Sequence, residues 1–406
     1  MATIHPFRPL VYATAAGDLD GLIAPPYDVI SVEDRAALAA RAPHNAVHLE
    51  VPAGPEEDVA DLIRAWRQDG VLERPDRPGL FAWTQTFDID GVEHTRRSLL
   101  TAVGLEPYSA GVVRPHERTH QGPIDGRLRL YRATTTQISP IFGVYPDSEG
   151  AVWAATDVGE VPDRVFVSDD GAVTNRIWWI DGPEALDAVR EAMRDRWILI
   201  ADGHHRYETG LRYRDEVRAG NGDQAGPWDT AMMGLSALED PGLVILPTHR
   251  VLTEWPGSAA SRMRREPATG LNEVLARLAA AAPDEPVFGL RTGAGWEVMV
   301  GPAPPPGATP GERLDVAVLE RELLIPDFGA DQARLNHDGR LGYIKDAAEA
   351  DRLVDSGEAA AVVVLRSLPK ASVAAVSDAR EVMPQKSTYF FPKLCTGVGF
   401  HPLADG

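Results

Sequence analysis

The stretch WILIADGHHRYETG, residues 197–210, decides the fold of the chain. Its first five residues are apolar and predict a short buried strand. Asp202 and Gly203 predict the turn that follows, and residues 204–219 predict an amphipathic helix. The chain therefore passes from a buried strand through a glycine turn into a helix, and the flanking segments extend this alternation.

Those segments mix strands and helices. Strands are expected at 80–89 and 92–104, with a hairpin turn at Asp90-Gly91. Further strands are expected at 139–145, 230–238, 243–251 and 360–365, and helices at 57–70, 125–137, 183–195 and 346–355. The run GPAPPPGATPG (301–311) predicts a loop or hinge. The fold class expected from this pattern is α/β of the mixed α+β kind.

Composition limits the class of protein. The 406 residues are enough for two or three lobes. We expect a core domain over 1–250, a second mixed α/β lobe over 251–370, and a C-terminal segment, 371–406, that packs back on the core. No apolar run approaches the roughly 18 residues that span a bilayer. The N-terminus does not read as a secretory signal. The single cysteine, Cys395, forms no internal disulfide, so a cytoplasmic protein without membrane partners is expected.

The net charge of −20 disfavours nucleic acid as a partner, because phosphate backbones bind cationic surfaces. A small-molecule substrate is expected instead, and the oligomeric state is left open. Local clusters of basic residues become informative against this acidic background.

The strand–turn–helix stretch has the chemistry of a phosphate site. Amides in the first turn of a helix have no intrahelical acceptors, and the helix dipole favours an anion there. His204, His205 and Arg206 fall in this turn, and Gly203 permits close approach of the backbone. Asp202 is suited to holding Mg²⁺ or taking a proton. Alternatively, Asp202 is a helix cap and one histidine makes a core hydrogen bond.

A second stretch, RPHERTHQGP (114–123), spells H-E-x-x-H, the zinc-protease motif. Pro115 before it and Gly122-Pro123 after it leave room for only about two helical turns, so a chance spelling competes with a zinc site. A distant third ligand such as Glu149 stays open. The segment 113–132 holds five arginines and two acids, which favours an anion or, alternatively, a salt-bridged helix face.

We interpret this stretch as a loop that faces the Asp202–Arg206 turn. Glu117 is the candidate base, His116 lies beside it, and Arg114 is an anion contact. His120 has no expected role.

Three other segments could contribute to the same cleft. QKSTYFFPK supplies Lys386, Ser387 and Thr388, a combination suited to phosphate or carboxylate, although the segment could equally be an aromatic anchor. PTHRVL supplies His249 and Arg250 after a buried strand, and APPYDVIS presents Tyr27 and Asp28 on a loop stiffened by prolines.

The motifs APPYDVIS, RPHE, SPIFGVY, ADGHHRYET, PTHRVL and MPQKSTYFFPKL occur in this order nearly end to end. The chain thereby resembles a widespread family of bacterial and archaeal proteins catalogued as domain of unknown function 1015. The D-G-H-H-R box (202–206) also resembles the D-G-x-H-R box of the ParB/sulfiredoxin-like fold, whose members include free-serine kinases, CTP-binding ParB-type proteins and sulfiredoxin. The resemblance implies a ParB/sulfiredoxin-like core with an additional mixed α/β lobe. It also implies phosphate contacts by His205 and Arg206, and Asp202 near a metal or the substrate hydroxyl.

The resulting functional hypothesis favours an enzyme, a phosphotransferase with an alcohol acceptor that uses Mg²⁺ held by Asp202 and a nucleotide donor, ATP or ADP. Resemblance implies free L-serine as the acceptor and O-phosphoserine as the product. Catalytic roles are expected for Glu117, Asp202 and His204. Substrate or phosphate contacts are expected for Arg114, His116, Gly203, His205, Arg206, His249, Lys386, Ser387 and Thr388. The alternatives are a regulatory protein that binds CTP or ATP without small-molecule turnover and, third, a metal-dependent hydrolase.

Overall fold

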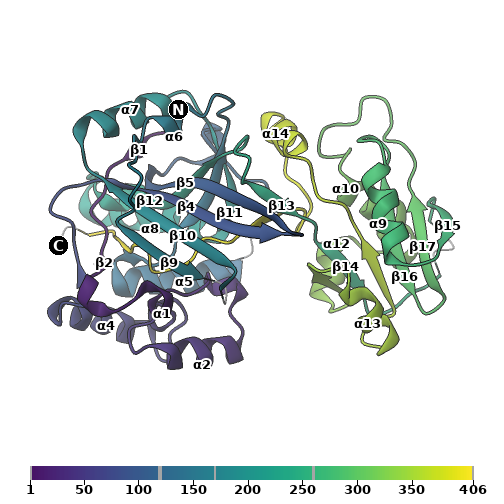
Figure 1. Ribbon diagram of the computed structural model, residues 1–406, viewed down its shortest axis with the longest axis horizontal. Coiled ribbons are helices and arrows are strands. Elements are labelled where there is room, and N and C mark those ends of the chain that lie inside the picture. Colours follow the sequence, from purple (N-terminus) through teal and green to yellow (C-terminus); the bar gives the residue numbers. More distant parts are fainter. Residues whose placement is uncertain (1, 118–120, 169–170, 258–260, 405–406) are drawn as a thin grey trace. The chain divides into compact units, whose positions relative to one another are not determined.

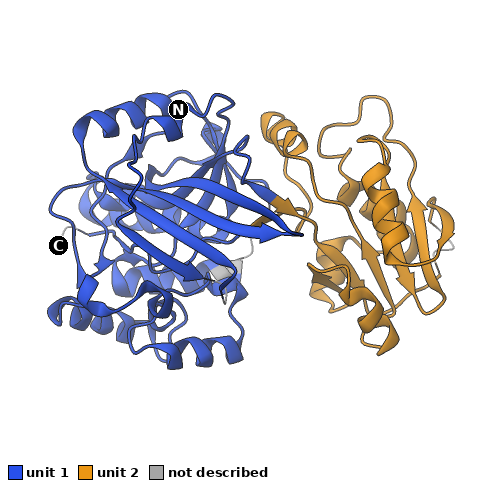
Figure 2. Ribbon diagram, viewed as in Figure 1, with its two compact units in different colours: residues 1–244, 392–406 blue, residues 245–391 orange. Residues whose placement is uncertain are grey.

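A computed structural model describes residues 2–117, 121–168, 171–257 and 261–404 of the chain. These residues form two compact units (Figure 2). Unit 1 consists of Met1–Val244 and Pro392–Gly406, and unit 2 is Ile245–Phe391. The first boundary lies close to the expected one at 250, whereas the chain returns to unit 1 well after the expected position 371. His120 lies outside the described residues.

A mixed sheet of nine strands forms the centre of unit 1 (Figure 1). The strand order is β6-β11-β8-β12-β5-β4-β10-β9, and β1 pairs with β5 outside this path. The pairs β6/β11 and β8/β12 are parallel, and the other pairs are antiparallel. The strands are β1 (Ile4–His5), β4 (Leu80–Ile89), β5 (Val92–Gly104), β6 (Val113–Arg114), β8 (Ile141–Tyr145), β9 (Arg164–Ser168), β10 (Val173–Ile180), β11 (Ile198–Asp202) and β12 (Thr230–Ala237). Two small pairs accompany them, β2 (Val11–Tyr12) with β3 (Leu72–Glu73) and β7 (Thr136–Gln137) with β21 (His401–Pro402).

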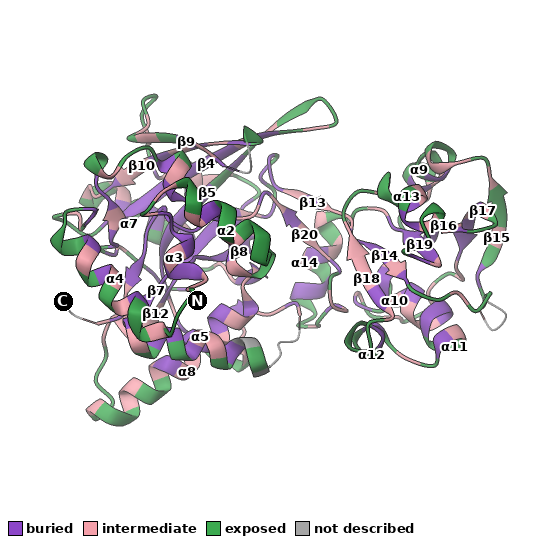
Figure 3. Cartoon of the chain, turned by 90° about the horizontal axis from the view of Figure 1, so that it is seen from below, coloured by how far each residue is buried: buried purple, intermediate pink, exposed green. Residues whose placement is uncertain are grey.

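The two faces of this sheet are covered differently. One face packs Leu99, Ile200 and Met233 against Val152, Val189 and other apolar residues of the helical layer, which makes one core. Buried residues follow much of the length of these strands (Figure 3). The C-terminal strip, which begins at Pro392, packs on the opposite face. There Gly234 leaves room for the side chain of Leu394. The helices are α1 (Leu19–Leu22), α2 (Val32–Arg41), α3 (Val47–Glu50), α4 (Glu56–Gln68), α5 (Gln121–Thr134), α6 (Ala151–Ala154), α7 (Pro183–Met193) and α8 (His204–Asn221).

Unit 2 is built on a six-stranded antiparallel sheet with the order β15-β17-β16-β19-β14-β18. These strands are β14 (His249–Leu252), β15 (Arg264–Ala268), β16 (Val287–Thr292), β17 (Gly295–Val300), β18 (Leu341–Ile344) and β19 (Ala361–Val364). Strands β13 (Val244–Leu246) and β20 (Tyr389–Phe391) pair separately. The helices are α9 (Leu271–Ala280), α10 (Asp315–Leu319), a π-helical turn (Glu320–Leu324), α11 (Ile325–Phe328), α12 (Gln332–His337), α13 (Glu349–Asp355) and α14 (Lys370–Asp378). Across the described residues, none of the helices has the length and apolarity needed to cross a membrane.

The structure confirms the mixed α/β class and most of the expected elements. The hairpin strands occupy 80–89 and 92–104 as predicted, and residues 301–311 contain neither helix nor strand. One expectation was wrong. The single strand at 243–251 is broken between β13 and β14, where Pro247 supplies no amide for a strand ladder. The helix expected at 125–137 is α5, which begins earlier, at Gln121, so that Gly122-Pro123 lies inside its first turn.

Candidate functional site

A β-bulge at the end of β11 turns Asp202 toward the candidate site. Ile200 pairs with Gly143 of β8 and Asp202 pairs with Phe142, so Ala201 is an extra residue in the register. In a regular strand, Asp202 would point to the same face as Ile200, which belongs to the apolar core. The bulge moves the carboxylate to the opposite face, together with Phe142.

Gly203 makes the turn from β11 into α8 in a conformation that other residues avoid. Its φ is 92°, and a Cβ atom there would lie 2.8 Å from Nε of Arg206. Glycine therefore allows the guanidinium of Arg206 to fold back over the turn. The Nη1 group of Arg206 donates to the carbonyl oxygen of Pro140, and its Nη2 group donates to Asp202.

Asp202 is held between two buried cations. Its Oδ2 atom pairs with Arg206, and its Oδ1 atom pairs with Nζ of Lys393, which comes from the C-terminal strip. The side chains of Asp202, Arg206 and Lys393 are 12%, 3% and 18% exposed. Burial lowers the pKa of Lys393, an effect that the charges of Asp28 and Glu117 oppose. A carboxylate and two cations thus share one poorly solvated position at the start of α8.

Two buried histidines, His116 and His204, hold the neighbouring loop in place, and both are neutral. The ring Nδ1 of His116 donates to the carbonyl oxygen of Ile200 at 2.5 Å, and the backbone amide of His116 donates to Nε2 of His204 at 3.3 Å. The two rings meet edge to face at 4.6 Å. Burial lowers the pKa of His116 to about 4 and the pKa of His204 well below its usual value, so both are neutral at pH 7.

The loop that carries Tyr27 reaches the same region. The amide of Tyr27 donates to Oε1 of Glu50 at 3.2 Å, and the guanidinium of Arg127 lies 3.6 Å from the centroid of the Tyr27 ring. Arg127 also pairs with Glu50, which is fully buried. Burial raises the pKa of Tyr27, and the charges of Arg206 and Arg127 oppose this effect.

The model of a family described as "Protein of unknown function (DUF1015)" matches residues 4–317. This match covers more than half of the chain. The chain belongs to this family. No curated protein matches it.

Several solved structures share parts of the architecture with this family member. They include a conserved hypothetical protein from Pyrococcus furiosus (TM-score 0.37, 12% identity, 72% of this chain and 90% of that one). A free serine kinase in complex with AMP has a TM-score of 0.39 and 12% identity, with 74% and 92% covered. SbnI with C-terminal truncation from Staphylococcus aureus has a TM-score of 0.35 and 10% identity, with 75% and 87% covered. Likeness at this level carries no information about function, and the ParB/sulfiredoxin-like assignment stays a prediction.

Most of the sequence-predicted site residues of this DUF1015 chain lie in unit 1. His116, Asp202, Gly203, His204 and Arg206 are in contact with one another around the β11–α8 turn. The charge of Glu117 acts on Lys393, and His205 acts on His204. Arg114 lies on β6, with its guanidinium 4.5 Å from the centroid of the Trp197 ring and its Nε donating to Gly111 at 3.0 Å.

The remaining predicted residues belong to unit 2. His249 is buried in β14, where its Nδ1 accepts the amide of Leu365 at 3.1 Å, and burial lowers its pKa to about 4. Ser387 donates to the carbonyl of Pro384, and Lys386 adopts a positive φ of 54°. These residues, together with Thr388, stay predictions as substrate contacts.

Lys393 is the site residue that the sequence did not single out. The motif MPQKSTYFFPKL contains two lysines, and Lys386 lies beside two hydroxyl groups, which made it the more obvious anion contact. Only the fold shows that Lys393 reaches Asp202, 191 positions away in sequence. A proline immediately before Lys393 and an apolar residue after it were the available local signals, and they are weak.

The arrangement is not a ready-made metal site. Both carboxylate oxygens of Asp202 are paired with cations. No group of three or more His, Cys, Asp or Glu side chains within the described ranges is placed to hold a metal ion. Mg²⁺ at Asp202 therefore stays a prediction. The geometry suits an anion better, because the cations there have little competition from solvent.

Proposed function

We propose that unit 1 is a phosphotransferase that moves a phosphoryl group from ATP or ADP to the hydroxyl of a small molecule. Free L-serine is the acceptor that the sequence resemblance favours. The proposal is carried by one observation, the buried Lys393–Asp202–Arg206 cluster at the glycine turn that opens α8. The same cluster would suit a protein that binds a nucleotide without turnover, and a transfer assay separates the two.

The cluster supports this reaction because phosphoryl transfer depends on positioning and on cations around the transferred group. Helix α8 has 18 residues, and its first-turn amides follow Gly203 directly. These amides, with the dipole of α8, favour an anion at that point. Nε of Arg206 is buried and has no hydrogen-bond partner among the described residues. Arg206 and Lys393 are thus the cations that we assign to the donor phosphates.

The proton of the acceptor goes to a carboxylate in this proposal. In the reaction, the bond between the terminal phosphorus and its bridging oxygen breaks, and the acceptor oxygen forms the new P–O bond. The low pKa of His116 makes it a poor base at neutral pH. His204 already accepts the His116 amide, so its part is to hold the loop that presents Glu117. Glu117 and Asp202 are therefore the candidate bases.

Divalent metal ions commonly assist phosphoryl transfer. Mg²⁺ is usually held by one or two carboxylates together with substrate phosphates. The described residues form no cage of three or more ligands for it, so any Mg²⁺ would enter with the nucleotide.

The test is a transfer assay with purified protein, a panel of hydroxyl acceptors including L-serine, and ATP or ADP with Mg²⁺. Phosphorus NMR or mass spectrometry would detect the phosphorylated acceptor. We expect O-phosphoserine from the native protein, none from Asp202→Asn, and a rate about 10²- to 10⁴-fold lower from Glu117→Gln. Asp229→Asn is the matched control and should retain activity, because it removes the partner of Arg218 near the far end of α8.

Two outcomes would contradict this proposal in different ways. Nucleotide binding measured by calorimetry without transfer to any acceptor would favour the regulatory alternative. Transfer that survives in Asp202→Asn would remove the cluster from the mechanism.

A further inference from the structure

A pocket of about 460 Å³ lies in unit 1 outside the candidate site. Small-molecule sites typically measure roughly 300–1,000 Å³, so this pocket has the volume of one. Its lining comes from β1 and the residues after it, the loop after β3, the loop between α8 and β12, and β21. Among its described lining residues, none belongs to the cluster of Asp202, Arg206 and Lys393.

The floor of this pocket lies on the same face of the sheet as Asp202. Asp202 pairs with Phe142, Phe142 pairs with Gly234, and Gly234 pairs with Leu100. Residues opposite each other on neighbouring strands point to one face, so these four share a face. Ala102, two positions beyond Leu100 on β5, points to that face as well and lines the pocket. Its small side chain leaves the space open.

The walls of the pocket are apolar and rigid. The ring of Phe7 is buried and meets the imidazole of His401 edge to face at 5.4 Å. Proline rings form much of the remaining wall, and proline offers a flat aliphatic surface without an amide donor. Such walls suit the faces of a flat apolar ring better than a sugar or another polar ligand. The prolines that line the pocket are Pro6, Pro78, Pro227 and Pro402.

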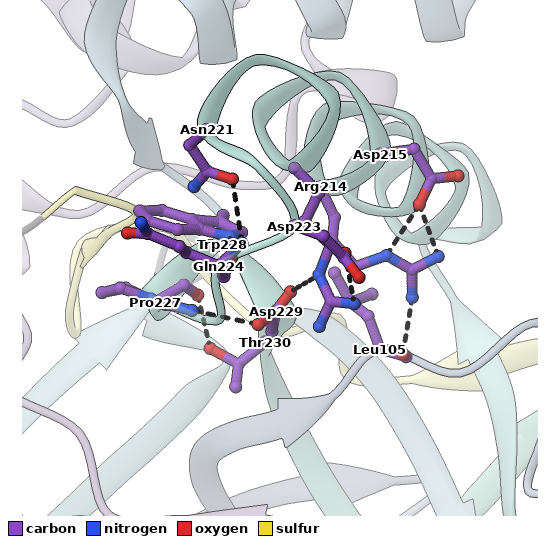
Figure 4. A network of polar contacts seen from close by, with 12 residues as sticks. Leu105, Arg214, Asp215, Asn221, Asp223, Gln224, Pro227, Trp228, Asp229 and Thr230 are labelled. Atoms are coloured by element: carbon purple, nitrogen blue, oxygen red, sulfur yellow. Dashed lines mark hydrogen bonds and ion pairs between the residues drawn. The ribbon is translucent and has the colours of Figure 1, made fainter.

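A buried histidine closes the wall without adding charge. The hydroxyl of Thr230 donates its one proton to the carbonyl of Pro227 at 2.9 Å (Figure 4). Its oxygen therefore accepts from Nε2 of His401, which lies 2.9 Å away. Burial lowers the pKa of His401 to about 3, so the ring is neutral, and its Nδ1 atom has no partner within the described residues. Thr230 and His401 thus fix the wall and leave the charge of the pocket to other residues.

Two arginines make the rim of the pocket positive. Nε of Arg8 donates to the carbonyl of Pro75 at 2.9 Å, and Nε of Arg74 donates to the carbonyl of Arg8 at 3.2 Å. Among the described residues no carboxylate pairs with Arg8. The one acid among the described lining residues, Asp229, is already paired with Arg218. An excess of positive charge beside an apolar pocket is unusual in a chain with a net charge of −20.

We propose that this pocket binds a small aromatic acid, a flat apolar ring that carries one carboxylate or phosphate group. The ring packs between Phe7 and the prolines, and the anionic group meets the guanidinium groups of Arg8 and Arg74 at the rim. The neutral histidine and the paired Asp229 do not oppose an anion there. This second ligand site does not depend on the proposed phosphotransferase.

The experiment compares probes that differ in one part of the ligand. Calorimetry measures the binding of 2-naphthoate, 2-naphthyl phosphate, the neutral 2-naphthamide, and acetate, which has no ring. We expect the two aromatic anions to bind more tightly than the amide and acetate not to bind. Arg8→Met should weaken both aromatic anions about 10-fold and leave the amide unchanged, because it removes a charge-assisted contact to the anionic group.

Two further variants test the position of the ligand. Ala102→Leu fills the floor and should weaken every ring-bearing probe about 10-fold or more. Arg67→Met is the matched control, since Arg67 is an exposed arginine of α4 that does not line the pocket. The probes should bind Asp202→Asn as they bind native protein. Because Arg8 is exposed, Arg8→Met should fold even if Ala102→Leu does not.

The outcomes separate this site from the proposed phosphate site. Equal affinity for the acid and the amide, or equal affinity of native protein and Arg8→Met for the acids, would overturn the assignment. Loss of aromatic anion binding in Asp202→Asn would place the ligand at the start of α8 instead. Dependence on Arg8 with either head group supports the proposal, and the tighter of the two anions identifies the preferred group. Phosphoryl transfer should be unchanged in Arg8→Met, so either proposal can fail without the other.

Discussion

The two ends of α8 carry the same chemistry in opposite surroundings. At the N-terminal end, Arg206 and Asp202 form a pair whose side chains are 3% and 12% exposed. At the C-terminal end, Arg218 pairs with Asp229, and these side chains are 36% and 19% exposed. Figure 4 shows the second region, in which Arg214 contacts Asp215 and the carbonyl of Leu105.

The difference separates a structural network from a candidate site. A hollow of about 600 Å³ lies beside the C-terminal end, lined by Arg214, Arg218 and neighbouring residues. Its arginines already pair with Asp215, Asp223 and Asp229, and water screens them. At the N-terminal end the charges are buried and Nε of Arg206 lacks a partner among the described residues. The hollow thus lies beside solvated ion pairs, whereas burial and the incomplete pairing of Arg206 support the site that we propose at the other end.

The largest difference in stability between the two ends should appear when the carboxylate of each ion pair is removed. Asp202→Asn leaves Lys393 and Arg206 buried without their carboxylate, which we expect to lower the free energy of unfolding by about 3–5 kcal/mol. Asp229→Asn breaks a more exposed pair and should cost about 0–1 kcal/mol. Urea denaturation of both variants measures the difference. Equal losses would mean that burial does not distinguish the two ends.

The next effect is a pH dependence that belongs to the buried end. The pKa of His116 is about 4 in the folded protein and 6.5 when unfolded, so only the unfolded chain takes up a proton between these values. The free energy of unfolding is therefore unaffected by His116 well above pH 6.5. It falls as the pH drops from 6.5 toward 4, and the loss reaches about 2 kcal/mol at pH 5. His116→Asn keeps a donor for Ile200 but cannot titrate, and should flatten that part of the profile.

Denaturation of native protein and His116→Asn at pH 7 and pH 5 gives the measurement. Parallel profiles for the two proteins would show that His116 titrates alike in the folded and unfolded states. His401, which contacts Thr230 of the C-terminal network at 2.9 Å, also has a pKa lowered by burial, to about 3, so the difference between native protein and His116→Asn is what isolates the effect of His116.

Sequence reasoning succeeded where the chemistry is local. WILIADGHHR predicted the strand, the glycine turn and the helix, because apolar run, turn residue and helix start follow each other within ten residues. It could not show the bulge at Ala201, since nothing in WILIA distinguishes a regular strand from an irregular one. It also could not select Lys393, which reaches Asp202 from 191 positions away in sequence.

Two glycines with positive φ allow a matched comparison of the backbone at the two ends. Gly203 has φ 92° and faces Arg206, whereas Gly222 has φ 74° and open space where a Cβ atom would lie. Gly222→Ala should cost about 1–2 kcal/mol, the ordinary penalty for a left-handed residue. Gly203→Ala should cost about 1 kcal/mol more, because Arg206 must also move. Thermal denaturation would show whether Gly203→Ala is the more destabilising of the two variants. Equal losses of stability would mean that the turn does not constrain Arg206.

The smallest effect should be the response of the two ends to salt. Arg218→Gln removes a solvated cation that pairs with Asp229 and Asp223, and we expect a small loss of unfolding free energy in 0.1 M NaCl. At 1 M NaCl the Debye length falls to about 3 Å, so most of this difference should disappear. The cost of Asp202→Asn should change little over the same range, because ions do not enter the buried pair. If salt reduced both costs in the same proportion, the charges around Asp202 would be solvated as well, and the reason for placing the phosphate site at the start of α8 would be lost.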